Sequence, residues 1–225
     1  MKRLVIFDLD GTLLNTIDDL GTATNHALRK AGYPEHSLSA YPMFVGNGIS
    51  KLIERALPEE ARTQETITRI RELFTEYYDA HCTDTTRPYP CIPELLDELH
   101  SRGVAMAVAS NKYHKATCKL ISTFFPNIPW VAVEGQKPDI PVKPDPSIVF
   151  EILSAHPTPK SEVLYVGDSG VDIETARRAC VESVGVTWGF RHVSELKSHY
   201  ADHIVSDPDD IIDLLDTPPS VCPQG

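Results

Sequence analysis

The chain has 225 residues, of which 41% are hydrophobic, and its formal net charge is −11. This length is enough for one substantial hydrophobic core, with or without a small satellite domain. The negative charge disfavours nucleic acid as a partner, because phosphate backbones are bound by basic surfaces, and no apolar run approaches the roughly 20 residues that a membrane span needs.

The first predicted element is a buried strand, VIF at residues 5–7, which is followed by Asp8 and Asp10. A continuous apolar run of this kind is typical of a strand in a parallel sheet. Two acids separated by one residue share a side of the pleat, at the end of the strand where open α/β sheets bind ligands. Taken alone, the same letters are explained equally well by a polar Asp-Gly turn.

Three helices are predicted next, and after them the pattern changes. The helices are expected over residues 17–31, 49–57 and about 60–81. From about residue 88 onward, helices and strands alternate. The expected strands are 104–110, 130–133, 163–167 and 183–187, and the expected helices are 93–103, 113–123, 146–155 and 171–180.

This order predicts an α/β protein, a doubly wound parallel sheet with a Rossmann-like core and an inserted helical domain. The catalytic core is expected to comprise residues 1–14 and 86–225. Residues 15–85 are expected to form a helical cap, or lid. Because this insertion directly follows the first strand, it is expected to lie over the carboxyl ends of the strands.

Two further polar clusters are expected where strands end or in the loops that follow them. Ser110, Asn111 and Lys112 follow a buried run with groups that can donate hydrogen bonds to phosphate oxygens. Lys143 lies in a loop that the neighbouring prolines stiffen. Taken alone, the first cluster is better explained by a capped turn, and the second by a surface loop.

The last cluster, YVGDSGVD at residues 165–172, is the sharpest signal. Gly167 permits a close backbone approach after a buried strand, and Asp168 and Asp172 follow at the start of a helix. Acids at a helix start also complement the helix dipole, yet oxygen ligands at strand ends are what Mg²⁺ prefers. Four such clusters in one chain favour a functional site over four coincidences.

With the motifs Asp-x-Asp-Gly-Thr, Ser-Asn, Lys-Pro and Gly-Asp-Ser-x-x-Asp, the chain resembles the haloacid dehalogenase superfamily. Within it, the chain is similar to the phosphoglycolate-phosphatase-like phosphatases with a helical cap. The resemblance implies that Asp8 is the nucleophile, which forms an aspartyl-phosphate, and that Asp10 is the general acid and base. It also implies that Ser110 and Lys143 bind the phosphoryl group, and that Asp8, Asp168 and the backbone carbonyl of Asp10 bind Mg²⁺.

Supporting roles are expected for Thr12, Gly167 and Asp172, the last from the edge of the site. Substrate contacts are expected from two places in the chain. One is the pair Asn111 and Lys112. The other is the turn at the start of a cap helix, whose amides suit a carboxylate or another anion, although an ordinary helix start explains it equally. The residues of this turn are Gly46, Asn47 and Gly48.

The expected function is Mg²⁺-dependent hydrolysis of a small phosphorylated metabolite, with 2-phosphoglycolate as the best single guess. A phosphomutase of the β-phosphoglucomutase type and a pyrophosphatase are the alternatives on the same fold. A dehalogenase is disfavoured because Asp10 would have no alkoxide to protonate. A phosphonate hydrolase would need Lys30 or Lys51 as a Schiff base, and the complete set of motifs argues against a scaffold protein.

The remaining expectations concern location and single residues. The apolar start is short and soon acidic, so no signal peptide and a cytoplasmic location are expected. The five scattered cysteines are expected to be reduced thiols. Cys91 stands where this family usually has a glycine in a turn, and His114 and His192 are expected at the surface. The tail TPPSVCPQG is predicted to be frayed, and the oligomeric state is not readable from the sequence.

Overall fold

The computed structural model describes residues 1–216, so the predicted tail at 217–225 lies outside the described residues. Its centre is a six-stranded sheet with the order β5-β4-β1-β6-β7-β8, and every neighbouring pair is parallel. The predicted doubly wound α/β fold is therefore confirmed. The strands are β1 (Leu4–Phe7), β4 (Ala105–Tyr113), β5 (Trp130–Gln136), β6 (Val163–Gly167), β7 (Glu182–Val186) and β8 (His203–Val205).

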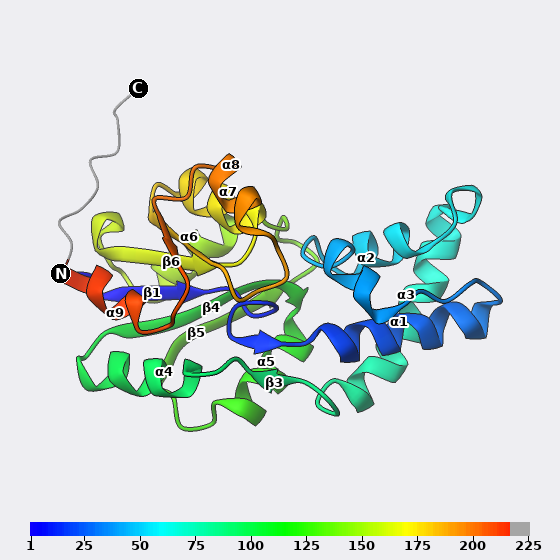
Figure 1. Ribbon diagram of the computed structural model, residues 1–225, viewed down its shortest axis with the longest axis horizontal. Coiled ribbons are helices and arrows are strands. Elements are labelled where there is room, and N and C mark those ends of the chain that lie inside the picture. Colours follow the sequence, from blue (N-terminus) through cyan, green and yellow to red (C-terminus); the bar gives the residue numbers. More distant parts are fainter. Residues whose placement is uncertain (217–225) are drawn as a thin grey trace.

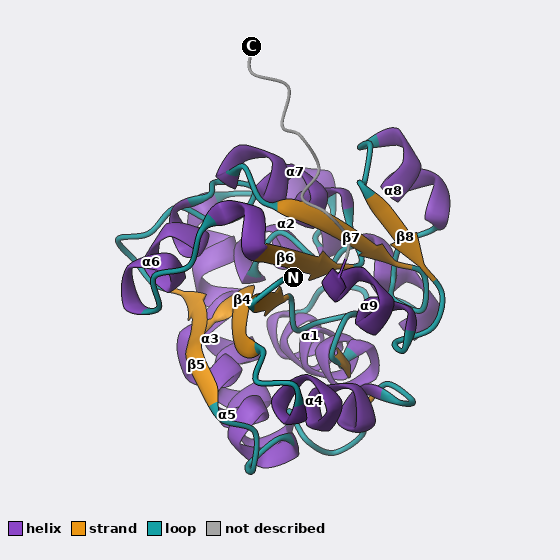
Figure 2. Ribbon diagram, turned by 90° about the vertical axis from the view of Figure 1, so that its left-hand side faces the viewer, coloured by secondary structure: helices purple, strands orange, loops and turns teal. Residues whose placement is uncertain are grey.

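Helices cover both faces of this sheet (Figure 2). Side chains alternate across the pleat, so Val5 and Phe7 of β1 join one hydrophobic cluster, while Leu4 and Ile6 join the other. The first cluster includes residues of α4 (Ile92–Ser101), α5 (His114–Phe124) and α9 (Asp210–Asp213), and the second includes residues of α6 (Ser147–Ala155) and α7 (Gly170–Ala179). Burial on both faces explains why the strand is continuously apolar.

A helical insertion lies beyond the carboxyl ends of β1 and β4 (Figure 1). We call it the cap. Its helices are α1 (Ile17–Ala31), α2 (Ile49–Ala56) and α3 (Gln64–His81), with short 3-10 helices at Leu38–Met43 and Glu59–Ala61. As predicted, α1 ends at Gly32, which adopts a left-handed conformation with φ of 83°.

The chain enters and leaves the cap through a small antiparallel ribbon of β2 (Leu14–Asn15) and β3 (Arg87–Pro88). The sequence did not predict this ribbon, because two-residue strands carry no periodicity. It brings the entry and exit points of the cap side by side. We propose that the cap spans residues 15–85 and that the core comprises residues 1–14 and 86–225, so that both boundaries fall at this ribbon.

Several boundaries differ from the predicted ones. Strand β4 continues to Tyr113, three residues past the expected end, and β5 continues to Gln136. Strand β8, α8 (Val193–Ser198) and α9 were not predicted. Helix α3 begins at Gln64 rather than near residue 60, because the side chain of Thr63 caps it by accepting a hydrogen bond from Thr66 N. None of the helices in residues 1–216 is long and apolar enough to cross a membrane.

Cys91 shows how the chain departs from the pattern of the family it resembles. It is the residue before α4, and its φ of 62° places it in the left-handed region that glycine adopts most easily. The turn geometry is thus kept although the side chain is larger. The Cys91 side chain is accommodated because the position is exposed to solvent.

Candidate active site

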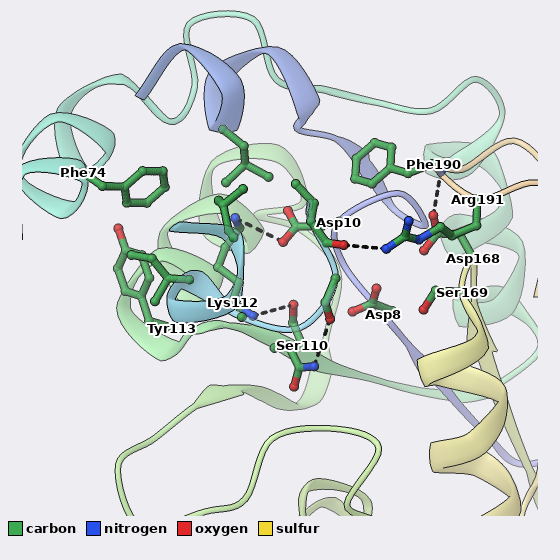
Figure 3. Close-up of a pocket in the computed structure, with 17 residues that line it drawn as sticks. Asp8, Asp10, Phe74, Ser110, Lys112, Tyr113, Asp168, Ser169, Phe190 and Arg191 are labelled. Atoms are coloured by element: carbon green, nitrogen blue, oxygen red, sulfur yellow. Dashed lines mark hydrogen bonds and ion pairs between the residues drawn. The ribbon is translucent and has the colours of Figure 1, made fainter. Parts of the chain in front are cut away.

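The two acids of the first motif lie at the carboxyl end of β1, as predicted. Asp8 N donates a hydrogen bond to Val166 O at 2.8 Å, and the Asp8 side chain faces a pocket between core and cap (Figure 3). Asp10 also lines the pocket, and its Oδ1 accepts a 2.6 Å hydrogen bond from Thr16 Oγ1. Gly11 follows with φ of 88°, and a Cβ at this position would collide with the Asp168 carboxylate. The turn therefore requires glycine.

Lys143 is buried beneath Asp8, where its side chain is 2% exposed. Its Nζ donates to Asp8 Oδ1 at 2.8 Å and to Asp172 Oδ1 at 2.7 Å, and it also contacts Tyr165 Oη and Ala109 O. Burial alone lowers a lysine pKa, but the carboxylates of Asp172 and Asp8 raise the pKa of Lys143 well above its usual value. The ammonium is therefore a fixed positive charge in this site.

Asp172, a predicted supporting residue, lies inside the site rather than at its edge. Asp172 is buried and binds Lys143 directly, while its Oδ2 accepts hydrogen bonds from Ser169 Oγ at 2.6 Å and from Ser169 N at 3.2 Å. This capping box fixes the first turn of α7. Gly167 makes room for it, because a Cβ at residue 167 would collide with the Asp172 side chain. Asp172 thus holds Lys143 in place.

Three buried carboxylates, from Asp8, Asp168 and Asp172, lie together at this end of the sheet. One oxygen of each lies within 4.8 Å of an oxygen of the other two. Burial, with the charge of Asp172, outweighs the attraction of Lys143 and raises the pKa of Asp8 to about 7. Burial and the charges of Asp172 and Asp8 also raise the pKa of Asp168 well above its usual value. Such a cluster needs a further positive charge to hold all three groups ionised.

The oxygens of this cluster fit a hard divalent cation. Asp168 Oδ2 accepts a 2.6 Å hydrogen bond from Phe190 N, and Asp8 Oδ1 accepts one from Lys143. Within residues 1–216, the second carboxylate oxygen of Asp8 and of Asp168 has no hydrogen-bond donor, whereas both oxygens of Asp172 are engaged. Asp8 and Asp168 therefore offer the two free oxygens that a cation such as Mg²⁺ takes from protein carboxylates.

The three polar residues near the end of β4 have different positions. Ser110 lines the pocket, and its Oγ accepts a 3.2 Å hydrogen bond from Lys112 N. Lys112 lines the pocket as well, where its Nζ forms a 3.1 Å ion pair with Asp10 Oδ2 and donates to Tyr78 Oη of the cap. These polar residues lie within the strand, rather than after it, because β4 continues to Tyr113, which pairs with Gln136 of β5.

Asn111 was expected to bind phosphate, but its side chain is occupied by other partners. Its Nδ2 donates to Gly46 O of the cap at 3.0 Å and to Lys143 O at 3.1 Å, and its Oδ1 accepts from Lys143 N at 2.8 Å. All the amide's hydrogens and its oxygen are thus bonded within the protein. Asn111 ties the backbone of Lys143 to the cap.

Only part of the cap turn that was expected to bind an anion, residues 46–48, lines the pocket. Gly46 and Gly48 line it, but Asn47 does not. The Asn47 side chain instead accepts a 2.7 Å hydrogen bond from Arg55, which also lies outside the pocket lining. The carbonyls of Phe44, Val45 and Gly46 are each bonded by a side chain, namely Arg55 at 2.9 Å, Arg191 at 2.8 Å and Asn111 at 3.0 Å. The loop is thus held by its carbonyls, and these contacts could not be predicted from local sequence patterns.

The pocket has two unlike walls. Its core side carries the polar groups already described, and its cap side is apolar. The apolar residues on the cap side are Leu20, Val45, Ile49, Leu52 and Phe74.

Sequence reasoning missed part of this lining. Phe190 and Arg191 reach the pocket from the loop after β7, and Tyr113 reaches it from the end of β4. The signal that could have found the first two is their place after a buried strand, at the same end of the sheet as the other clusters. Thr12, a predicted supporting residue, is buried, and its hydroxyl has no hydrogen-bond partner among residues 1–216.

Comparisons with known proteins agree with this geometry. The family model described as "Haloacid dehalogenase-like hydrolase" matches residues 5–186. The chain belongs to this family. It is 31% identical to the phosphoglycolate phosphatase of Vibrio parahaemolyticus, with 95% of this chain and 96% of that protein covered, and 31% identical to that of Aquifex aeolicus, with 95% and 97% covered.

Solved structures of the haloacid dehalogenase-like family share the whole architecture. The crystal structure of a provisionally named phosphoglycolate phosphatase from Lactobacillus delbrueckii subsp. bulgaricus matches with a TM-score of 0.89 and 32% identity, covering 96% of this chain and 99% of that chain. The match includes the cap as well as the sheet, since nearly all of both chains is covered. The resemblance inferred from the motifs is therefore confirmed.

Proposed function

We propose that this protein is a Mg²⁺-dependent phosphatase that hydrolyses a small phosphorylated metabolite, 2-phosphoglycolate first among them, through an aspartyl-phosphate on Asp8. The family match and the named relatives show that the chain is a phosphoric monoester hydrolase. The observation that carries the finer proposal is the floor of the pocket. There a carboxylate with one free oxygen is fixed by a buried lysine, beside a second carboxylate suited to a cation.

The cation proposed for this cluster is Mg²⁺, held by Asp8, Asp168 and the backbone carbonyl of Asp10. When bound, it supplies positive charge between the Asp8 carboxylate and the substrate phosphate, two anions that otherwise repel each other. Lys143 supplies the protein's own share of this neutralisation, because its ammonium bonds Asp8 at 2.8 Å. Ser110, on the pocket wall, is placed to donate its hydroxyl proton to a phosphoryl oxygen.

In the first proposed step, the free Asp8 oxygen attacks phosphorus, and the bond from phosphorus to the leaving alcohol breaks. Asp10 gives its proton to the leaving oxygen. In the second step, water attacks phosphorus, the bond from Asp8 to phosphorus breaks, and Asp10 takes the proton from water. The Asp10 carboxylate is oriented for both steps by Thr16 Oγ1 on one oxygen and by Lys112 Nζ on the other.

The named relatives favour a two-carbon leaving group. They are phosphoglycolate phosphatases, which favours hydrolysis of a glycolate ester over the phosphomutase alternative. The phosphonate hydrolase alternative has no support, because Lys30 and Lys51 are exposed and neither lines the pocket. Lys51 instead pairs with Glu54 at 2.7 Å. Pyrophosphate is as small as 2-phosphoglycolate, so it remains an alternative substrate and is included in the substrate panel below.

A substrate panel tests the proposal. Purified protein is assayed for phosphate release from 2-phosphoglycolate, pyrophosphate and glucose 1-phosphate, each with Mg²⁺ and with a chelator. We expect the highest kcat/KM for 2-phosphoglycolate and no release with the chelator. Isomerisation of the glucose ester in the presence of a sugar bisphosphate, without net phosphate release, would instead establish a mutase.

Metal binding is expected to depend on pH. In the metal-free protein the pKa of Asp8 is about 7, against 3.8 ordinarily, so folding favours its protonated form. The contribution of Asp8 to the free energy of unfolding is therefore fully present below about pH 3.8 and is lost as pH rises through about 7. Bound Mg²⁺ requires the ionised form. The Mg²⁺ dissociation constant is therefore expected to rise by up to about tenfold per pH unit below pH 7.

Thermal unfolding of the metal-free protein, with and without added Mg²⁺, measures this effect. Mg²⁺ is expected to raise Tm more at pH 8 than at pH 5.5, and Asp168→Asn is expected to abolish most of the increase. An equal increase at both pH values would show that binding is not coupled to protonation of this cluster.

A further inference from the structure

Among residues 1–216, Arg191 is the one positively charged pocket residue to which the proposed steps give no role. It follows β7 in the chain, its side chain is 12% exposed, and its guanidinium points toward the pocket between the cap loop and Asp168 (Figure 3). Arg191 lies close enough to Asp168 that its charge lowers the pKa of that carboxyl, although burial prevails. A largely buried cation in this place needs an explanation.

The guanidinium of Arg191 is only partly satisfied by the protein. It has five N–H groups, of which one donates to Val45 O at 2.8 Å and one faces the sulfur of Met43 at 3.7 Å. Its nearest carboxylate within residues 1–216, that of Glu195, lies 3.8 Å from Nε. One Glu195 oxygen also accepts a 2.9 Å hydrogen bond from Gly170 N. Arg191 therefore keeps donors for a ligand.

The other cations of the site differ from Arg191 in this respect. Lys112 is paired with Asp10 at 3.1 Å, and Lys143 is paired with Asp8 at 2.8 Å and with Asp172 at 2.7 Å. Of the two cations that line the pocket in the described part of the chain, Lys112 and Arg191, only Arg191 has no carboxylate within hydrogen-bond distance. The pocket thus has one cation available for a second charge on a ligand.

We propose that Arg191 is a specificity-determining residue that binds an oxyanion on the leaving group of the substrate. This inference rests on the proposed phosphatase function and narrows it to small phosphate compounds with a second anionic group. In 2-phosphoglycolate that group is the carboxylate, and in pyrophosphate it is the second phosphate. A planar guanidinium suits either, because it donates two parallel hydrogen bonds to such a group.

A purely structural role would have a different signature. If Arg191 only holds the cap loop through Val45 O, its loss weakens every substrate alike. Arg55 offers a matched control, because it bonds Phe44 O and Asn47 Oδ1 of the same loop but does not line the pocket. Arg177 is a control for the loss of a charge alone, since it is exposed on α7 and pairs with Glu174.

The experiment compares 2-phosphoglycolate and pyrophosphate with 2-hydroxyethyl phosphate, which has nearly the size of the first but no second charge. For Arg191→Gln, kcat/KM is expected to fall about 10- to 100-fold for the anionic substrate that the wild type prefers, mainly through KM. For 2-hydroxyethyl phosphate it is expected to change by less than about threefold. Arg191→Lys is expected to retain part of the preference, Arg55→Gln to affect all substrates equally, and Arg177→Gln to change nothing.

The outcomes separate this inference from the proposed function. Equal losses for charged and neutral substrates in Arg191→Gln would overturn the inference and leave the phosphatase in place. A wild type with equal kcat/KM for 2-hydroxyethyl phosphate and for the anionic substrates would also overturn the inference and leave the phosphatase in place. A wild type that releases phosphate from none of them would instead remove the proposed function. The Tm of each variant shows whether a lost activity reflects unfolding.

Discussion

Replacement of Asp8 by asparagine is expected to abolish phosphatase activity, with kcat falling roughly 10⁴-fold or more, because the nucleophile is lost. The fold should survive. Asp8 lies among buried carboxylates that raise its pKa to about 7, so a neutral amide of the same shape removes repulsion. We expect the Tm of metal-free Asp8→Asn at pH 8 to equal or exceed that of the wild type. Phosphate release from an aryl phosphate with Mg²⁺, beside thermal unfolding, measures both quantities.

Asp18 provides a matched control for Asp8. It lies in the first turn of α1, outside the pocket, so Asp18→Asn should keep wild-type activity. Activity in Asp8→Asn equal to that of the wild type would falsify the assignment of the nucleophile. Loss of activity together with a large drop in Tm would mean that Asp8 is mainly a structural partner of Lys143.

Replacement of Lys143 by methionine is expected to have the largest combined effect on activity and stability. The ammonium holds Asp8 and Asp172 together, and removal of one partner of a buried ion pair costs about 3 kcal/mol or more of unfolding free energy. We expect kcat to fall by about 10²- to 10³-fold as well, because the charge of the transferring phosphoryl group loses a preorganised partner. Denaturant unfolding and steady-state kinetics measure the two losses.

A double variant separates the two roles of Lys143. In Lys143→Met with Asp172→Asn, one unpaired buried charge is gone, so part of the stability should return while the activity stays low. The exposed Lys197→Met is the control, with no effect expected on either. Full recovery of activity in the double variant would show that Lys143 acts only by screening Asp172.

Strongly patterned segments of the sequence predicted the fold well. The run VIF followed by two acids gave both the strand β1 and its place at the ligand-binding edge, because a strand buried on both faces has few other solutions. The helices of the cap and the four strand-end clusters followed in the same way. The ribbon β2–β3 and the strand β8 did not, because two or three residues form a strand only when a neighbouring strand supplies the hydrogen bonds.

The parts of the site that were not predicted depend on contacts between distant segments. Asp172 looked like an acid at a helix start, and only the packing of α7 against β6 and β7 brings it onto Lys143 at 2.7 Å. Asn111 looked like a phosphate ligand, yet its amide joins Lys143 to the cap loop. Arg191 lies in a loop without periodicity, and only its place after a buried strand distinguishes it from a surface arginine.

The central claim is that Asp8 carries the phosphoryl group during turnover, and trapping that group tests it most directly. In Asp10→Asn, an aryl phosphate should still phosphorylate the enzyme, because its leaving group needs no proton, whereas hydrolysis should be slow. After acid quench and trypsin digestion, the account predicts one added phosphoryl group on Asp8, in the peptide of residues 4–29, that hydroxylamine removes. Phosphate release without any phosphorylated peptide, or a phosphoryl group on another residue, would contradict it.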